Sequence, residues 1–229
     1  MRGILYLRDI SKTRIEGSDI RTLTLFSKLV GKEAFPHVVF VTTMWGKLDT
    51  EGKKVAFKRE NELKEDFWNE MIEQGSWMTR FEGNKASAEG IISQLVGDAD
   101  PVILQLQHEL IDKDLELAAT AAGSILVPIV EEKLVESKSK LQRFRARLVG
   151  ESNSTMQRRV LSEINKVEKE RDQAQSDKDV LKGKLGSEVK GKVSEGKNWQ
   201  ETLRTICTVF GVGVTVVTAI VPAASCNIM

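Results

Sequence analysis

Four residues at the end of a short apolar run are the first candidates for chemistry in this sequence. The run is Val38–Thr42, it follows Pro36, and it has no polar alternation. Such a run predicts a strand buried on both faces of a parallel sheet. Ligands of these sheets bind at the carboxyl ends of the strands. The sequence therefore points to Thr42, Thr43, Met44 and Trp45 as candidate binding residues.

Other reactive groups are sparse. His37 and His108 have no second histidine, cysteine or carboxylate at metal-ligand spacing, so we expect no metal site. No Ser/His/Asp triad or catalytic carboxylate pair is identifiable, although a site assembled only in space would leave no mark in one sequence. The phosphate-cradling motif Gly-x-x-x-x-Gly-Lys-Ser/Thr does not occur. We therefore name no catalytic residue.

The composition narrows the classes of function. The 229 residues include 34 Lys and Arg against 33 Asp and Glu, a balance that argues against a nucleic-acid binder. The two cysteines, Cys207 and Cys226, lie in the last 23 residues and cannot form a disulfide framework for the folded part. The apolar run at the N-terminus is too short for a secretory signal.

The elements around the candidate loop follow an α/β pattern. A second apolar strand is predicted at Gly3–Leu7, and Ser18 caps a helix of apolar 3–4 spacing that ends at Gly31. With Val38–Thr42 these segments make one βαβ unit, expected to be right-handed. The pattern continues with a helix at Val55–Gln74, a strand at Ser76–Phe81, a helix from Ser87 to Gly97 and a helix at His108–Ala122.

After Pro128 the composition changes to that of long polar helices. Leu134, Leu141 and Leu148 are seven residues apart, and a break follows at 150–155. From Val160 to Leu185 apolar residues keep a 3–4 spacing with charges around them, a coiled-coil pattern weakened by charged residues at two positions of the seam. These two positions are Arg171 and Lys178.

The C-terminal tail is uncharged and apolar. As a helix, Ile206–Ala224 would span roughly 28 Å, close to the hydrocarbon thickness of a bilayer. Arg204 and Lys197 precede it, which favours a body on the cytoplasmic face of a membrane. The alternative is a buried piece of a globular core, because its many valines favour strands. We expect membrane association.

The last four residues offer a second route to a membrane. Cys226–Met229 fits the Cys-a-a-X prenylation pattern, although Asn227 is not aliphatic. A spanning tail would carry Cys226 away from the cytosol, where prenyl transfer takes place, so the two routes conflict. We rank the tail anchor before the lipid anchor.

Several separated stretches are similar to those of a known family. They are GILYLRDIS at 3–11, VTTMW at 41–45, RENEL at 59–63, FW at 67–68 and ATAAG at 119–123. Together they resemble a large set of fungal G-domain proteins of the P-loop class, related to septin-like and immunity-associated GTPases, over roughly residues 1 to 185. The resemblance implies a parallel sheet that binds GTP and Mg²⁺, with Thr42, Thr43, Met44 and Trp45 at the base-recognition loop. It also implies a second base-side loop at Glu82-Gly83-Asn84, with Gly83 and Asn84 as binding residues.

The chain departs from the family in two respects. The P-loop, which relatives carry upstream of the strand that begins here at Gly3, is absent, so the sequence looks like the carboxyl-terminal part of a G domain, truncated or degenerate. Trp45 also stands where relatives read guanine with an Asp. A Trp can stack on a base but cannot accept its N–H bonds, and Asp49 is the nearest substitute.

These expectations combine into four regions and two functions. The regions are a partial G-like domain (1–128), a helical coiled-coil extension (129–185), a linker (186–200) and a membrane-associating tail (201–229). The first function is a G-domain-like protein that binds guanine nucleotide by resemblance but not on its own, with no catalytic activity. The second is a non-enzymatic, membrane-tethered interaction protein that self-associates through the coiled coil.

Overall fold

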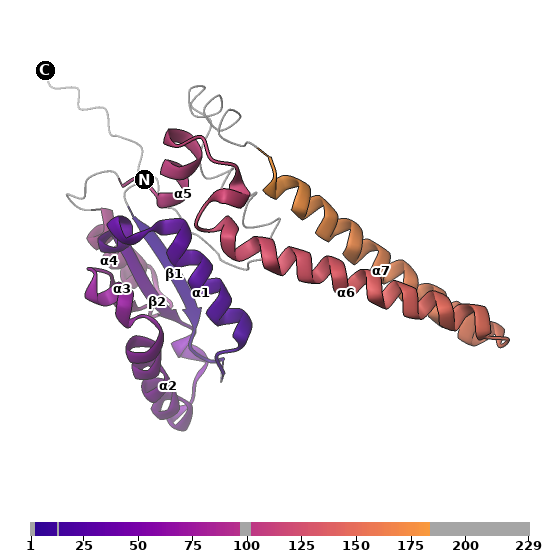
Figure 1. The fold of residues 1–229 in the computed structure, drawn as a ribbon. Coiled ribbons are helices and arrows are strands. Elements are labelled where there is room, and N and C mark those ends of the chain that lie inside the picture. The colour runs from indigo at the N-terminus through magenta and orange to yellow at the C-terminus, as the bar shows by residue number, and fades with distance from the viewer. Residues whose placement is uncertain (1–2, 13, 97–101, 184–229) are drawn as a thin grey trace, which may run out of the picture. The chain divides into compact units, whose positions relative to one another are not determined.

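The computed structural model describes residues 3–12, 14–96 and 102–183, which divide into two compact units, 3–108 and 109–183 (Figure 1). The first unit is a small parallel sheet of three strands with helices on both faces. The second is formed largely by two long helices. The α/β fold class expected from the sequence is confirmed at this level.

The predicted strand–helix–strand unit is present at the start of the chain. Strand β1 (Ile4–Asp9) is followed by helix α1 (Gly17–Val30), a 3₁₀ turn over Lys32–His37 and strand β2 (Val38–Thr43). The two strands are parallel, with Leu5 opposite Val39. Gly31 ends α1 at a φ of +82°, where an added Cβ would also lie 2.5 Å from the Cβ of Gln105. The close approach therefore requires glycine.

The prediction of one continuous helix over Val55–Gln74 is wrong. Helix α2 (Thr50–Glu62) starts earlier, because the Asp49 side chain accepts a hydrogen bond of 2.7 Å from the backbone N–H of Gly52. A π turn over Leu63–Phe67 then separates it from the short helix α3 (Asn69–Glu73). The interruption coincides with Trp68, which is 1% exposed and stacks on Phe40 of β2 with ring centroids 4.6 Å apart.

The third strand and the remaining helices complete the unit. Strand β3 (Trp77–Arg80) pairs in parallel with β2, so the strand order is β1-β2-β3. Helix α4 (Lys85–Val96) follows, and a single turn, α5 (Gln105–Gln107), contacts α1. The helix predicted at His108–Ala122 is wrong: a π turn at His108–Asp112 and a 3₁₀ turn at Leu117–Ala119 are separated by Asp114 in the left-handed region.

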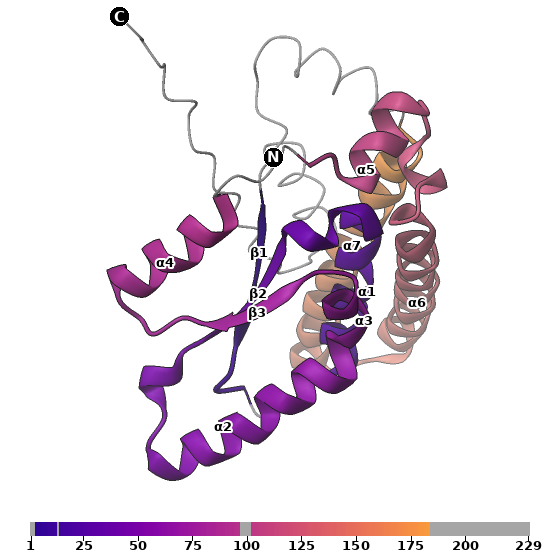
Figure 2. The same ribbon diagram turned by 90° about the vertical axis from the view of Figure 1, so that its left-hand side faces the viewer.

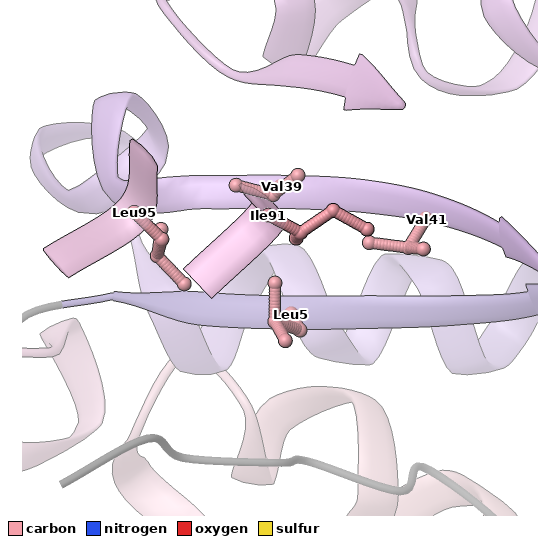
Figure 3. Packing of buried hydrophobic residues seen from close by; sticks show 5 residues of the cluster. All are labelled: Leu5, Val39, Val41, Ile91 and Leu95. Carbon is pink, nitrogen blue, oxygen red and sulfur yellow. The ribbon is translucent and has the colours of Figure 1, made fainter. Parts of the chain in front are cut away.

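The two faces of the sheet have different coverings (Figure 2). On one face, Tyr6 and Phe40 of the strands meet Phe26 of α1 and Trp68 in a connected aromatic cluster. The other face is covered by α4 alone among the described elements. Figure 3 shows its packing, in which strand residues meet two residues of α4. The residues shown are Leu5, Val39, Val41, Ile91 and Leu95.

The second unit is a helical hairpin. Helix α6 (Gly123–Gly150) and helix α7 (Ser154–Leu181) run antiparallel, joined by three residues, and Asn153 caps α7 (Figure 1). The helices expected after Pro128 are thus present, although α6 runs through Pro128. Their shared core contains Leu141, Val160, Ile164 and Val167. The heptad pattern predicts Lys178 in the seam between the helices, but the structure buries its neighbour Asp177 there. The Lys178 ammonium instead forms an ion pair with the Glu131 carboxylate, with an N–O distance of 2.9 Å.

Several expectations concern residues outside the described ranges. The linker, the apolar tail and Cys226 all lie there. The predicted tail anchor and lipid anchor depend on these residues and therefore remain predictions. Within the described ranges no helix combines the length and the apolar character needed to cross a bilayer. The compact units divide after His108, whereas the composition places a boundary at 128.

Candidate functional site

An apolar cleft of about 600 Å³ lies at the carboxyl ends of the strands in the first unit. Strands β1 and β2, the loops after β2 and β3, and helix α4 all contribute to it. The lining residues are Leu5, Leu7, Val41, Thr43, Met44, Trp45, Gly46, Lys47, Phe81, Glu82, Gly83, Ala88, Ile91 and Ile92. Parallel sheets place ligands at this edge, so the cleft is the candidate site.

The cleft is open because α4 covers only part of its face of the sheet. Ile91 and Leu95 are buried against the strands, but Ile92, one residue along the helix, is 38% exposed. Leu7 near the end of β1 is 40% exposed and Met44 is 42% exposed. Three large apolar side chains thus remain in contact with water around one cavity.

The loop after β2 turns sharply at Met44. Its backbone has a φ of +67°, in the left-handed region that non-glycine residues seldom adopt. The next residues form one 3₁₀ turn, Trp45–Lys47, in which the N–H of Lys47 donates to the carbonyl of Met44 at 3.1 Å. This turn places Met44 and Lys47 beside the cleft.

A buried polar cluster fixes this loop to the rest of the unit. The Trp45 indole N–H donates to the Thr42 hydroxyl at 3.0 Å, and that hydroxyl donates to Glu60 of α2 at 2.9 Å. Arg80 at the end of β3 donates to both oxygens of the Glu60 carboxylate. The hydrogen bonds and charge of Glu60 raise the pKa of Arg80. The cluster therefore joins α2, β2 and β3 through one carboxylate.

The ring of Trp45 is enclosed by the same groups. The Arg80 guanidinium lies 4.5 Å from the centroid of the Trp45 ring and 4.6 Å from that of Phe57 on α2. The Trp45 and Phe57 rings are themselves 5.4 Å apart. Trp45 is only 6% exposed, so little of its ring is available for stacking on a ligand.

A second carboxylate lies at the carboxyl end of β1. The side chain of Asp9 accepts hydrogen bonds from the hydroxyl and the backbone N–H of Ser11, at 2.6 and 2.9 Å. Burial opposes its ionised form, but these hydrogen bonds and the charges of Lys47 and Lys12 outweigh burial and lower the pKa of Asp9. The carboxylate is therefore ionised at neutral pH and engaged by the turn that follows β1.

The structure brings together four of the six residues suggested by the resemblance. Thr43, Met44, Trp45 and Gly83 line the cleft. Thr42 is fully buried within the polar cluster. The Asn84 side chain accepts a hydrogen bond of 2.8 Å from the N–H of Ser87 in the first turn of α4.

The sequence prediction missed further residues of the site. Lys47 and Phe81 follow strand ends, so the same rule that selected Thr42–Trp45 could have found them. Glu82, which belongs to the loop that the resemblance implies, also lines the cleft. Glu60 and Arg80 carried no such signal, because their pairing depends on the position of α2 over the sheet.

The lining determines which ligands suit the cleft. Among the described residues, Lys47 and Glu82 are the only charged ones that line the cleft, and they have opposite signs. In the part of the chain that the structure describes, no cluster of three or more His, Cys, Asp or Glu side chains is placed to hold a metal ion. The arrangement favours an apolar group over a polyanion, which would need several cationic or N–H donors.

Comparison with known proteins adds no relative. No protein-family model, no curated protein and no solved structure matches this chain.

Proposed function

We propose that this protein is a non-enzymatic binding protein with a G-domain-like α/β unit, whose cleft binds an apolar group instead of a nucleoside triphosphate. The observation that carries the proposal is that Trp45, at the base-recognition position of the resemblance, is engaged by other residues of the protein. Trp45 has its N–H bonded to Thr42 and its ring enclosed by Arg80 and Phe57. A guanine reader at this position would need a free acceptor directed into the cleft.

The charges of the cleft support the same proposal. A nucleoside triphosphate carries several negative charges, which P-loop proteins neutralise with backbone N–H groups, a lysine and Mg²⁺. Here Lys47 is balanced by Glu82 among the lining residues. The apolar side chains Leu7, Met44 and Ile92 instead provide contact area for hydrophobic binding.

Guanine-nucleotide binding remains a second candidate. It is favoured by the position of Thr43, Met44, Trp45 and Gly83 together at the edge where the resemblance implies a base. In this alternative the cleft holds the guanine base of GTP. Binding of the phosphates and of Mg²⁺ then depends on groups that another segment supplies.

A titration with labelled GTP distinguishes the two candidates. We expect no saturable binding up to millimolar GTP in the presence of Mg²⁺, measured by equilibrium dialysis of the full chain. The same chain with Lys47→Ala is the control, since Lys47 lines the cleft and only GTP bound there would depend on that lysine. Saturation at micromolar GTP would overturn the proposal and favour the second candidate.

The helical hairpin is the second surface for binding. Its seam is filled within one chain by residues such as Leu141 and Ile164. Self-association through this region, as expected from the heptad spacing, would therefore have to use its outer faces. Membrane attachment through the tail stays a prediction that depends on residues beyond the described ranges.

A further inference from the structure

A polar hollow of about 430 Å³ lies along the helical hairpin, between α6 and α7. Two small residues, Ser137 of α6 and Ala174 of α7, line it, and both are buried. Elsewhere the seam between the helices is filled by larger apolar side chains, such as Leu134, Leu141 and Val167. The small pair therefore leaves room beside the seam that the hairpin itself does not fill.

One carboxylate is buried in the wall of this hollow. Asp177 is 5% exposed, and its Oδ1 accepts a hydrogen bond of 2.8 Å from the Gln173 amide. Among the described residues, none donates to its Oδ2 or forms an ion pair with it. The Ser137 hydroxyl donates to the carbonyl of Leu134 instead. Since a buried carboxylate without a cation is costly, the position suits a cation that comes from outside the hairpin.

The hollow carries both signs of charge in equal number. Three lysines and three carboxylates line it, namely Lys133, Lys140, Lys169, Glu136, Glu170 and Asp177. Lys140 pairs with Glu136 on the same helix, at 3.2 Å. Within the described ranges no carboxylate forms an ion pair with Lys133 or Lys169. These two ammonium groups can therefore pair with a neighbouring molecule.

We propose that the hairpin binds a second copy of this chain through the hollow, with Lys133 and Lys169 of each copy directed at Asp177 of the other. A two-fold contact brings the same patch of both copies together, so the patch must be complementary to itself. Equal numbers of lysines and carboxylates meet this condition, whereas a patch of one sign would repel its copy. Each copy then supplies the cation that the buried carboxylate of the other lacks.

The contact leaves the seam of each hairpin closed. Leu141 and Ile164 stay packed within one chain, and the second copy adds beside them. The proposal thus assigns a partner to the hairpin, the second binding surface named above, and it does not depend on the apolar cleft of the first unit.

Sedimentation equilibrium of the full chain measures the association. We expect a reversible dimer, and Asp177→Asn should weaken it by about 30-fold or more, the effect of removing one partner of a buried charge pair. Glu163→Gln is the matched control, because Glu163 is exposed on α7 and does not line the hollow. The control should leave the dissociation constant within about twofold of the wild type.

Two charge-reversed chains distinguish a contact between copies from one within a chain. The first carries Asp177→Lys, and the second carries Lys133→Glu together with Lys169→Glu. Each alone would bring like charges together across the contact and should be monomeric. An equimolar mixture restores opposite charges at both ends of the contact and should form a mixed dimer. Mixing could not restore a pair that forms within one chain.

Three results would each overturn the proposal: a strictly monomeric wild type, a dimer that Asp177→Asn weakens no more than Glu163→Gln does, and a mixture of folded charge-reversed chains that stays monomeric. Amide exchange in α6 and α7 verifies the fold of each variant. Where a reversed charge unfolds the hairpin, Asp177→Asn alone decides, because it keeps the shape of the side chain. The proposed function is tested separately by the GTP titration, since no residue of the hollow lines the cleft.

Discussion

At the scale of single residues, Glu60 is the group on which the loop after β2 depends. Its side chain is 5% exposed, and it receives hydrogen bonds from Thr42 and Arg80. Removing the cation from a buried pair leaves an uncompensated charge, and such changes cost about 3–5 kcal/mol. Arg80 is 40% exposed and Thr42 still donates to Glu60. We therefore expect a loss near the lower end of that range, about 3 kcal/mol, for Arg80→Met.

The double variant gives this prediction its control. Replacing both partners, Glu60→Met with Arg80→Met, should be less destabilising than Arg80→Met alone, because no buried charge remains. Lys32→Met breaks the exposed pair with Glu70 and should change stability by less than about 1 kcal/mol. Urea unfolding measures all of these variants. A single variant as stable as the wild type would show that Glu60 is not held by Arg80.

Asp19 gives a second prediction at this scale, for pH. A hydrogen bond from Arg8, at 2.8 Å, lowers the pKa of Asp19, and the backbone N–H of Glu16 contributes further. Since the folded pKa lies below the unfolded one, the carboxylate contributes its stability above the unfolded pKa of about 4. That stability is lost as the pH falls through the folded value.

Asp19→Asn should therefore be less stable than the wild type at pH 7. The difference should shrink as the pH is lowered below about 4. Urea unfolding at pH 7, 5 and 3 measures it, with Glu89→Gln at an exposed pair as the control. A difference that is constant across this range would mean that the effect of the substitution is unrelated to ionisation.

At the scale of elements, the hairpin can be tested through its seam. Ile164 is 7% exposed within the shared core, whereas the preceding apolar residue of the helix, Leu161, is 45% exposed. Ile164→Ala should lower the free energy of opening by about 2 kcal/mol, the lower end of the range for buried truncations, which corresponds to roughly 30-fold faster amide exchange in α6 and α7.

Leu161→Ala is the matched control for the hairpin. The two substitutions remove similar side chains from the same helix, so helix propensity changes little between them. Exchange in Leu161→Ala should stay close to that of the wild type. Equal acceleration by both variants would argue that the two helices do not pack through Ile164.

The sequence predicted the strands and helices better than the turns that interrupt a helix. Val38–Thr42 was recognisable as a buried strand because it is apolar without alternation, and the structure extends it by one residue. The π turn before Trp68 could not be predicted, since it depends on a ring that must reach Phe40. The loop after β2 was found by its place at a strand end, but the internal role of Trp45 required the positions of Glu60 and Arg80.

At the scale of the whole molecule, the α/β unit has a cleft at the carboxyl ends of its parallel strands, the edge where such sheets bind ligands. The described residues that line this cleft are mainly apolar. The account therefore predicts selectivity for apolar groups at this edge.

Methyl NMR of the full chain with labelled methionines tests this central claim most directly. Met44 is exposed at the cleft, whereas Met71 is buried in α3 and does not line the cleft, so it serves as an internal reference. The account predicts that neither methyl resonance moves on addition of GTP and Mg²⁺ up to millimolar concentration. A shift of the Met44 resonance that saturates at micromolar GTP, with Met71 unchanged, would contradict it.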